Sequence, residues 1–129
     1  MRVYEDFVTL GVLSGGHAEI TLGRGAFDEP FGLFGYDMDD YDTVFTEHLD
    51  LLLQITRPSS VSLRGGHCAP LLGSWAGLRL VQQRCRSEST SGGNRGSLMR
   101  ADKLRLPVAT AMTPGSTARL AENLKPYGE

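Results

Sequence analysis

Helix-like and strand-like segments alternate along this chain, and that order constrains its fold more than any other feature. Val3, Phe7 and Leu10 lie on one face at helical spacing, and the Ser-Gly-Gly run at 14–16 ends this first helix. Residues 18–22 then alternate apolar and polar side chains, which is typical of a strand. The strand ends in a glycine-rich turn, where the chain is free to change direction sharply.

The later segments continue the alternation. Acidic residues at 37–42 lead into a second helix, whose apolar stripe consists of Phe45, Leu49, Leu52 and Leu53. The segments after it are a short helix carrying Leu98, Ala101 and Leu104, a buried strand at 106–112, and a last short helix carrying Leu120 and Leu124. Strands that alternate with helices indicate βαβ units around a parallel sheet, so we predict the α/β class.

Residues 61–91 are harder to interpret. Residues 64–67 favour a loop, 78–81 a short strand, and 84–91 are polar without a period. The chain also begins inside a helix without a capping residue before it, so we expect an internal piece of something longer.

Composition places the chain among globular proteins. It has 129 residues, enough for one domain, with 40% hydrophobic and 22% charged residues. A formal net charge of -2 gives no reason to expect nucleic acid or a membrane surface as a partner. No run reaches the roughly 18 apolar residues of a membrane span, and the first residues lack a signal peptide's apolar core. We therefore expect a cytoplasmic location.

Few side chains indicate catalysis or metal binding. Cys68 and Cys85 are not in a C-x-x-C pair and are interpreted as bystanders. His17, His48 and His67 lack partners at useful spacing and are interpreted as structural or solvated. The acidic residues at 37–42 favour helix N-terminal charge over a metal site. We identify no catalytic residue, and the aromatic residues Phe27, Phe31, Phe34 and Tyr36 either line a pocket or belong to the core.

Two glycine-rich turns are the candidates for ligand binding. Arg24 lies between glycines directly after a strand, where its guanidinium offers donors for a phosphate. The run Gly92-Gly93-Asn94-Arg95-Gly96-Ser97 precedes a helix, whose free N–H groups favour an anion. Each is also explained as a plain turn, and neither matches the dinucleotide fingerprint or the P-loop.

The segment 6–55 resembles the luciferase-like flavin monooxygenase family, to which bacterial luciferase belongs. Residues 6–16 are similar to the family's helix and its D-x-L-S-G-G turn, and 20–25 to its next strand and arginine-glycine turn. The likeness continues without a gap through Phe31, Phe34, Gly35, Tyr41, Phe45, Glu47 and Leu49. A weaker likeness at 92–129 includes the family's G-G-x-x-x-S loop and its L-P strand.

The resemblance implies a fold, an activity and a set of binding residues. The fold is a partial (β/α)8 TIM barrel, with residues 1–129 forming a single incomplete domain, because a whole barrel takes about 250 residues. The activity is oxygenation of a small organic substrate by dioxygen with reduced FMN. The residues that would hold the flavin phosphate are Arg24, Gly25, Gly93, Asn94 and Ser97.

Several alternatives stay open. A deazaflavin-dependent oxidoreductase would use the same turns, and a truncated fragment would bind flavin without turnover. A flavin reductase and a second copy of the chain are the candidate protein partners. The stretch 74–91 lacks the family's proline-rich run and aromatic strand, and one hypothesis is a shifted reading frame there. Resequencing the gene tests that idea: homologues sharing residues 84–90 in one clean frame would contradict it.

Overall fold

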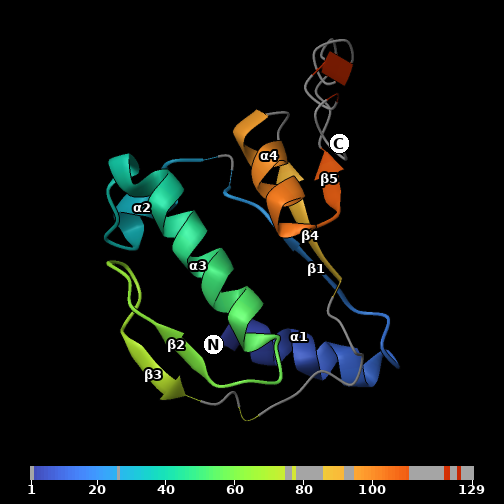
Figure 1. Ribbon diagram of the computed structural model, residues 1–129. Helices are drawn as coiled ribbons and strands as arrows, with labels where there is room; N and C mark the ends of the chain where they lie inside the picture. Colours follow the sequence, from blue (N-terminus) through green and yellow to red (C-terminus); the bar gives the residue numbers. More distant parts are fainter. Residues whose placement is uncertain are drawn as a thin grey trace. The chain divides into compact units, whose positions relative to one another are not determined.

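The computed structural model describes residues 2–25, 27–74, 77, 86–91, 95–110, 121–122 and 125. The chain divides into two compact units, which are described one at a time. The first consists of Met1–Ala18 and Arg24–Cys85, and the second of Glu19–Gly23 and Arg86–Glu129. The architecture is mixed α/β, as the alternation in the sequence predicts (Figure 1). Within the described residues, no helix is long and apolar enough to cross a membrane.

The first unit begins with α1 (Arg2–Leu13), which confirms the predicted first helix. The helix ends where the sequence indicates, because Gly15 and Gly16 take φ values of 64° and 92°. Such left-handed conformations suit glycine and close the end of a helix. The N–H of Gly16 donates to the carbonyl of Gly11 at 2.7 Å, which satisfies one of the last helical acceptors.

The buried face of α1 differs from the face that the sequence marks. Tyr4, Val8 and Gly11 are buried, whereas Val3 and Leu10 are exposed. Both faces carry apolar residues, so periodicity alone does not decide between them. The packing partners decide, because Tyr4 and Val8 form a core cluster with Ile55 and Val61.

Two short helical segments precede the long helix of this unit. They are α2 (Glu29–Leu33) and the 3-10 helix η1 (Met38–Asp40), and η1 leads directly into α3 (Tyr41–Ile55). The carboxylate of Asp37 accepts a hydrogen bond from the backbone N–H of Asp39 at 3.0 Å. The acidic residues therefore lie before and in the first turn of α3, where negative charge is favourable.

An antiparallel pair of strands completes the first unit. These strands are β2 (Val61–Leu63) and β3 (Leu71–Ser74), with the predicted loop at 64–67 between them. Val61 joins Tyr4, Val8 and Ile55 in the core, against which Leu51, Leu52 and Leu71 pack. Burial of these apolar side chains holds α1, α3 and the strand pair together.

The second unit contains a parallel three-stranded sheet. Its strands are β1 (Glu19–Leu22), β4 (Arg86–Ser91) and β5 (Val108–Thr110), in the order β1-β4-β5. The helix α4 (Arg95–Leu104) connects β4 to β5 and forms with them a βαβ unit. The buried apolar residues on these elements and just after α4 are Ile20, Leu98, Ala101 and Leu106.

The position of β4 corrects the sequence interpretation. Residues 84–91 show no strand pattern, yet β4 occupies most of that segment as the central strand. Backbone hydrogen bonds to a neighbour on each side require no particular side-chain pattern. The strand predicted at 106–112 begins later, at Val108, because Pro107 has no N–H to donate. The segment 78–81 and most of the predicted last helix lie outside the described residues.

Candidate functional site

Arg24 is the predicted site residue whose surroundings are best defined. It follows the end of β1 by two positions, and its side chain is only 17% exposed. Its Nη1 atom lies 2.6 Å from Oδ1 of Asp42, and its Cζ atom lies 4.9 Å from the centre of the Tyr41 ring. The guanidinium is therefore fixed by an ion pair and a cation–π contact from the first turn of α3.

The backbone conformation at position 25 explains why a glycine is found there. Its φ is 81°, in the left-handed region where a side chain causes strain. Its carbonyl accepts a hydrogen bond from the Tyr41 hydroxyl at 3.3 Å, so Tyr41 contacts both predicted residues of this turn. A Cβ atom added at Gly25 would meet nothing within 4 Å, so the backbone there is open to approach.

The second predicted turn is described only at its end. Ser97 lies in the first turn of α4 and is 7% exposed, while Gly93 and Asn94 fall outside the described residues. Ser97 belongs to the second unit, whereas Arg24 and Gly25 belong to the first. That the two turns share one phosphate therefore stays a prediction.

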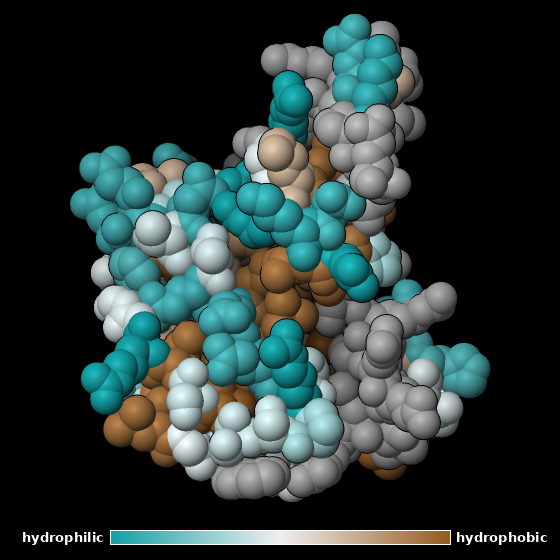
Figure 2. Space-filling model, viewed as in Figure 1, coloured by the Kyte–Doolittle hydropathy of each residue, from teal (hydrophilic) through white to brown (hydrophobic). Residues whose placement is uncertain are grey.

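Negative charge dominates the segment around Arg24. No Lys or Arg stands between Arg24 and Arg57 in the sequence. The acidic residues from Arg24 to the first turn of α3 are Asp28, Glu29, Asp37, Asp39, Asp40 and Asp42. Figure 2 shows hydrophilic surface gathered over α2 and the start of α3. A phosphate at Arg24 would meet this negative charge, so further donors are needed to hold it strongly.

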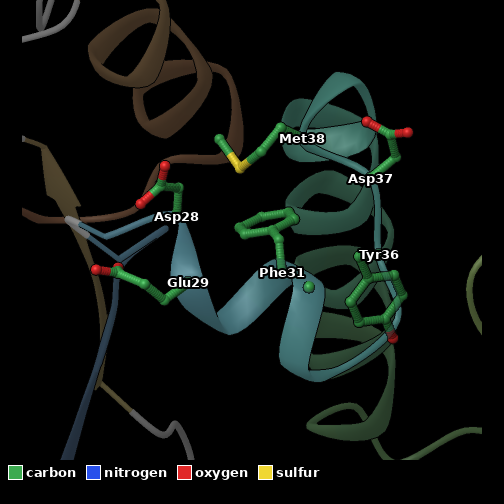
Figure 3. A pocket seen from close by; sticks show the side chains of 7 residues that line it. Asp28, Glu29, Phe31, Tyr36, Asp37 and Met38 are labelled. Atoms are coloured by element: carbon green, nitrogen blue, oxygen red, sulfur yellow. The ribbon is translucent and has the colours of Figure 1, made fainter.

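A hollow of about 390 Å³ lies beside this segment in the first unit (Figure 3). Its lining residues are Asp28, Glu29, Phe31, Gly32, Tyr36, Asp37 and Met38. Phe31 and Tyr36 therefore line a pocket, which was one of the two interpretations of the aromatic residues. Phe27 and Phe34 are exposed and belong neither to this pocket nor to the core.

One ring of the pocket lining also contacts the tyrosine beside Arg24. The ring of Phe31 lies 5.4 Å from the ring of Tyr41 and 6.4 Å from that of Tyr36, measured between centres. Tyr41 in turn contacts the guanidinium of Arg24. Aromatic rings at these separations stabilise one another, so Phe31 and Tyr41 link the lining of the hollow to Arg24.

Comparison with known proteins assigns the chain to a family. A family model described as luciferase-like monooxygenase matches residues 1–124. The chain belongs to this luciferase-like monooxygenase family. The crystal structure of monooxygenase RslO1 from Streptomyces bottropensis matches 98% of the chain with a TM-score of 0.86 and 16% sequence identity. At that identity the match shows the fold alone.

One relative is similar in sequence. An uncharacterized protein, y4wF of Sinorhizobium fredii, is 36% identical over 67 residues, which are 52% of this chain and 20% of that protein. The chain likewise covers 38% of the RslO1 chain. The luciferase-like chain thus spans well under half the length of both proteins.

Glu47 is the residue of this luciferase-like chain whose role sequence reasoning missed. Its carboxylate accepts hydrogen bonds from the backbone N–H groups of Gly66, His67 and Cys68, at 3.0, 3.2 and 2.6 Å. Three consecutive N–H groups around one anion form a nest. The glycine pair at 65–66 is the signal for it, because a Cβ at Gly65 would overlap the Glu47 carboxylate.

The nest changes the acidity of both groups that it brings together. Partial burial raises the pKa of Glu47, but hydrogen bonds from Cys68, His67 and Gly66 lower it more, so it lies below its ordinary value near 4.5. Burial raises the pKa of the Cys68 thiol above 9.0, and the bond to Glu47 and its charge raise it further. Cys68 therefore stays protonated at neutral pH, which makes it a poor nucleophile.

The histidines contact backbone carbonyls or a hydroxyl group. His17 Nδ1 lies 2.8 Å from the carbonyl of Ser14, and His48 Nδ1 lies 2.8 Å from that of Val44. His67 Nε2 lies 3.3 Å from the Thr43 hydroxyl. These contacts support the structural interpretation of the histidines. Within the part of the chain that the structure describes, no group of three or more His, Cys, Asp and Glu side chains is arranged to hold a metal ion.

Proposed function

We propose that this chain forms the phosphate-binding part of a flavin-dependent, luciferase-like monooxygenase. The observation that carries the proposal is the Arg24 turn: a largely buried guanidinium beside an open glycine backbone, directly after β1. Membership of the luciferase-like monooxygenase family supports an oxidoreductase, and this family usually uses flavin or deazaflavin cofactors. Both cofactors carry phosphate, so the same residues would serve either.

The chemistry of these residues fits a phosphate. Arg24 would donate charge-assisted hydrogen bonds to its oxygens, and the Gly25 backbone would approach it without steric hindrance. Gly93, Asn94 and Ser97 would add donors near the start of α4, where the helix dipole favours an anion. These additional donors would offset the carboxylates around Arg24.

In the proposed activity the protein binds, orients and shields its cofactor. When bound, reduced FMN supplies the electrons that activate dioxygen, so that one oxygen atom enters a small organic substrate and the other leaves as water. Arg24 would fix the phosphate end and so orient the ring system. The Phe31 and Tyr41 rings would keep water from one side of Arg24.

The whole protein is proposed to be a (β/α)8 barrel of which this chain is a part. The parallel β1-β4-β5 sheet with α4 as its crossover supports that proposal. The substrate, a flavin reductase that supplies the cofactor, and pairing with a second copy are proposals for that longer protein. The cytoplasm is its proposed location.

The test compares FMN with riboflavin, which is the same flavin without the phosphate. Each is titrated into the purified chain and followed by flavin fluorescence, for the parent, Arg24→Gln and Arg57→Gln. Arg57 is exposed and lies just after α3, so its variant loses the same charge elsewhere in the same unit. We expect the parent and Arg57→Gln to prefer FMN, and Arg24→Gln to lose most of that preference.

Equal affinity of the parent for FMN and riboflavin would contradict the proposal. A deazaflavin titrated in parallel identifies the cofactor class: tighter binding of the deazaflavin would favour a deazaflavin-dependent oxidoreductase using the same turn.

A further inference from the structure

Asp42 and Tyr41 lie side by side on the first turn of α3, and both contact the Arg24 turn. Asp42 provides the carboxylate of the ion pair, and Tyr41 provides a ring face for the guanidinium and a hydroxyl for the Gly25 carbonyl. All of these residues belong to the first unit. The geometry therefore shows Arg24 already engaged by an anion of the chain itself.

We propose that Asp42 is an internal competitor for the phosphate: it occupies Arg24 until a phosphate-bearing ligand displaces it, while Tyr41 keeps the guanidinium in place. This inference rests on the proposed function, because it assumes that Arg24 is the phosphate ligand. Tyr41 would position Arg24 for the phosphate, whereas Asp42 would weaken phosphate binding.

The exposure of the two partners supports an exchangeable pair. The Asp42 side chain is 67% exposed, whereas the Arg24 side chain is 17% exposed. A carboxylate that faces water is able to rotate away and regain its hydration, whereas the arginine would have to leave its contact with Tyr41. The structure therefore favours movement of Asp42 and retention of Arg24 when a stronger anion arrives.

Electrostatics gives the expected size of the competition. Two like unit charges about 6 Å apart in water repel each other enough to weaken binding roughly three-fold. A phosphate monoester carries nearly two charges at neutral pH, so the effect of Asp42 on it is roughly three- to ten-fold. Loss of the ion pair would also loosen Arg24, but the contact with Tyr41 remains and limits that loss.

The experiment has a binding arm and a ligand-free arm. In the first, FMN and riboflavin are titrated into the parent, Asp42→Asn and Asp39→Asn. Asp39 lies in the same acidic segment, its side chain is exposed, and it is not among the partners described for Arg24. We expect Asp42→Asn to bind FMN three- to ten-fold more tightly with riboflavin unchanged, and Asp39→Asn to show a smaller gain. Asp42→Glu, which keeps the charge, should stay near the parent.

In the second arm, phenylglyoxal modifies arginine side chains and mass spectrometry of peptides reports the rate at Arg24. The Asp42 carboxylate lies against Nη1 of Arg24 and hinders the reagent there, so Asp42→Asn should speed modification of Arg24 while Arg57 stays as in the parent. Circular dichroism of each variant establishes that it is folded.

The outcomes distinguish failure of the competition by Asp42 from failure of the proposed function. An unchanged rate at Arg24 in folded Asp42→Asn would overturn the inference, because the pair would then be absent in solution. A faster rate with unchanged or weaker FMN binding would also overturn it, and the proposed function would stand if Arg24→Gln still removed the FMN preference. If the parent lacked an FMN preference and Asp42→Asn gained one, the competition would hold and the proposed function of the parent would fail.

Discussion

Two charged side chains at α3 are held in different ways: Arg24 contacts the helix from outside, and Glu47 belongs to it. Arg24 contacts two side chains of this helix, the exposed carboxylate of Asp42 and the ring of Tyr41. Glu47 is held by the backbone, through the N–H groups of residues 66–68. A side chain exchanges its partner by rotating, whereas backbone donors leave only if their loop moves. The comparison indicates that Glu47 fixes the structure and that Arg24 is the charge available to a ligand.

The largest expected effect comes from disrupting the hydrogen bonds between the loop backbone and Glu47. Gly65→Ala places a Cβ on the Glu47 carboxylate, which must swing out and lose its hydrogen bonds to the loop. We expect the midpoint of thermal unfolding, followed by circular dichroism, to fall by several degrees. Gly66→Ala is the matched control, since its Cβ would meet nothing within 4 Å, and should unfold near the parent temperature. Equal melting of both variants would refute the close approach.

Acidification should weaken the same hydrogen bonds in the parent. The pKa of Glu47 is lowered in the folded chain, so its contribution to stability is complete above the ordinary value near 4.5 and is lost as the pH falls through the folded pKa. Glu47→Gln should therefore be less stable than the parent at pH 7, and the difference should shrink as the pH falls below about 4.5. Urea unfolding at several pH values measures this.

A second carboxylate of α3 provides the control for that experiment. Asp50 is exposed and accepts a hydrogen bond from the Gln54 side chain at 2.9 Å rather than from a loop backbone. Asp50→Asn should change stability little at any pH. If it matched Glu47→Gln, general charge on α3 would explain the result and the nest would not.

The ion pair between Arg24 and Asp42 should contribute much less to stability than the backbone hydrogen bonds to Glu47. Asp42→Asn removes an ion pair whose carboxylate is largely exposed, so we expect a loss of about 0.5 kcal/mol at low salt. That loss should shrink further at high salt, because ions screen exposed charges. Chemical denaturation at two salt concentrations checks it. A loss comparable to that in Gly65→Ala would contradict the distinction between an exchangeable and a fixed charge.

The smallest effect concerns the Tyr41 hydroxyl. Tyr41→Phe removes a long hydrogen bond of 3.3 Å to the Gly25 carbonyl but keeps the ring over Arg24. The change in unfolding free energy should stay below about 0.5 kcal/mol, at the low end for hydrogen bonds. Tyr41→Leu, which also removes the cation–π contact, should cost about 0.5–1 kcal/mol more. The same denaturation curves compare the two variants. If Tyr41→Phe lost more stability than Tyr41→Leu, the hydroxyl and not the ring would make the main contribution.

Much of the fold follows from local sequence signals. The Ser-Gly-Gly run predicts the end of α1, the apolar stripe predicts α3, and Leu98 with Ala101 marks the buried face of α4. These are signals within one helix or at its end. Two features depended on distant partners instead: β4, which is polar but central in its sheet, and the face of α1 that meets Ile55 and Val61.

The candidate site also combines features that follow from local sequence signals with features that depend on distant residues. Arg24 and Gly25 were predicted from a glycine-rich turn after a strand, and the conformation of Gly25 agrees with that. The pairing of Arg24 with Asp42 joins residues 18 positions apart, and the bond from Gly66 to Glu47 joins residues 19 positions apart. Periodicity and turn signals contain no information on such pairs, so only the folded chain reveals them.

The most direct test is the rate at which phenylglyoxal modifies Arg24 in the parent chain with saturating FMN, with riboflavin, and without flavin. We expect FMN to slow modification of Arg24, riboflavin to leave it unchanged, and Arg57 to react at one rate throughout. Equal rates at Arg24 with both flavins, or equal protection of Arg57 by FMN, would contradict the claim that Arg24 receives the phosphate.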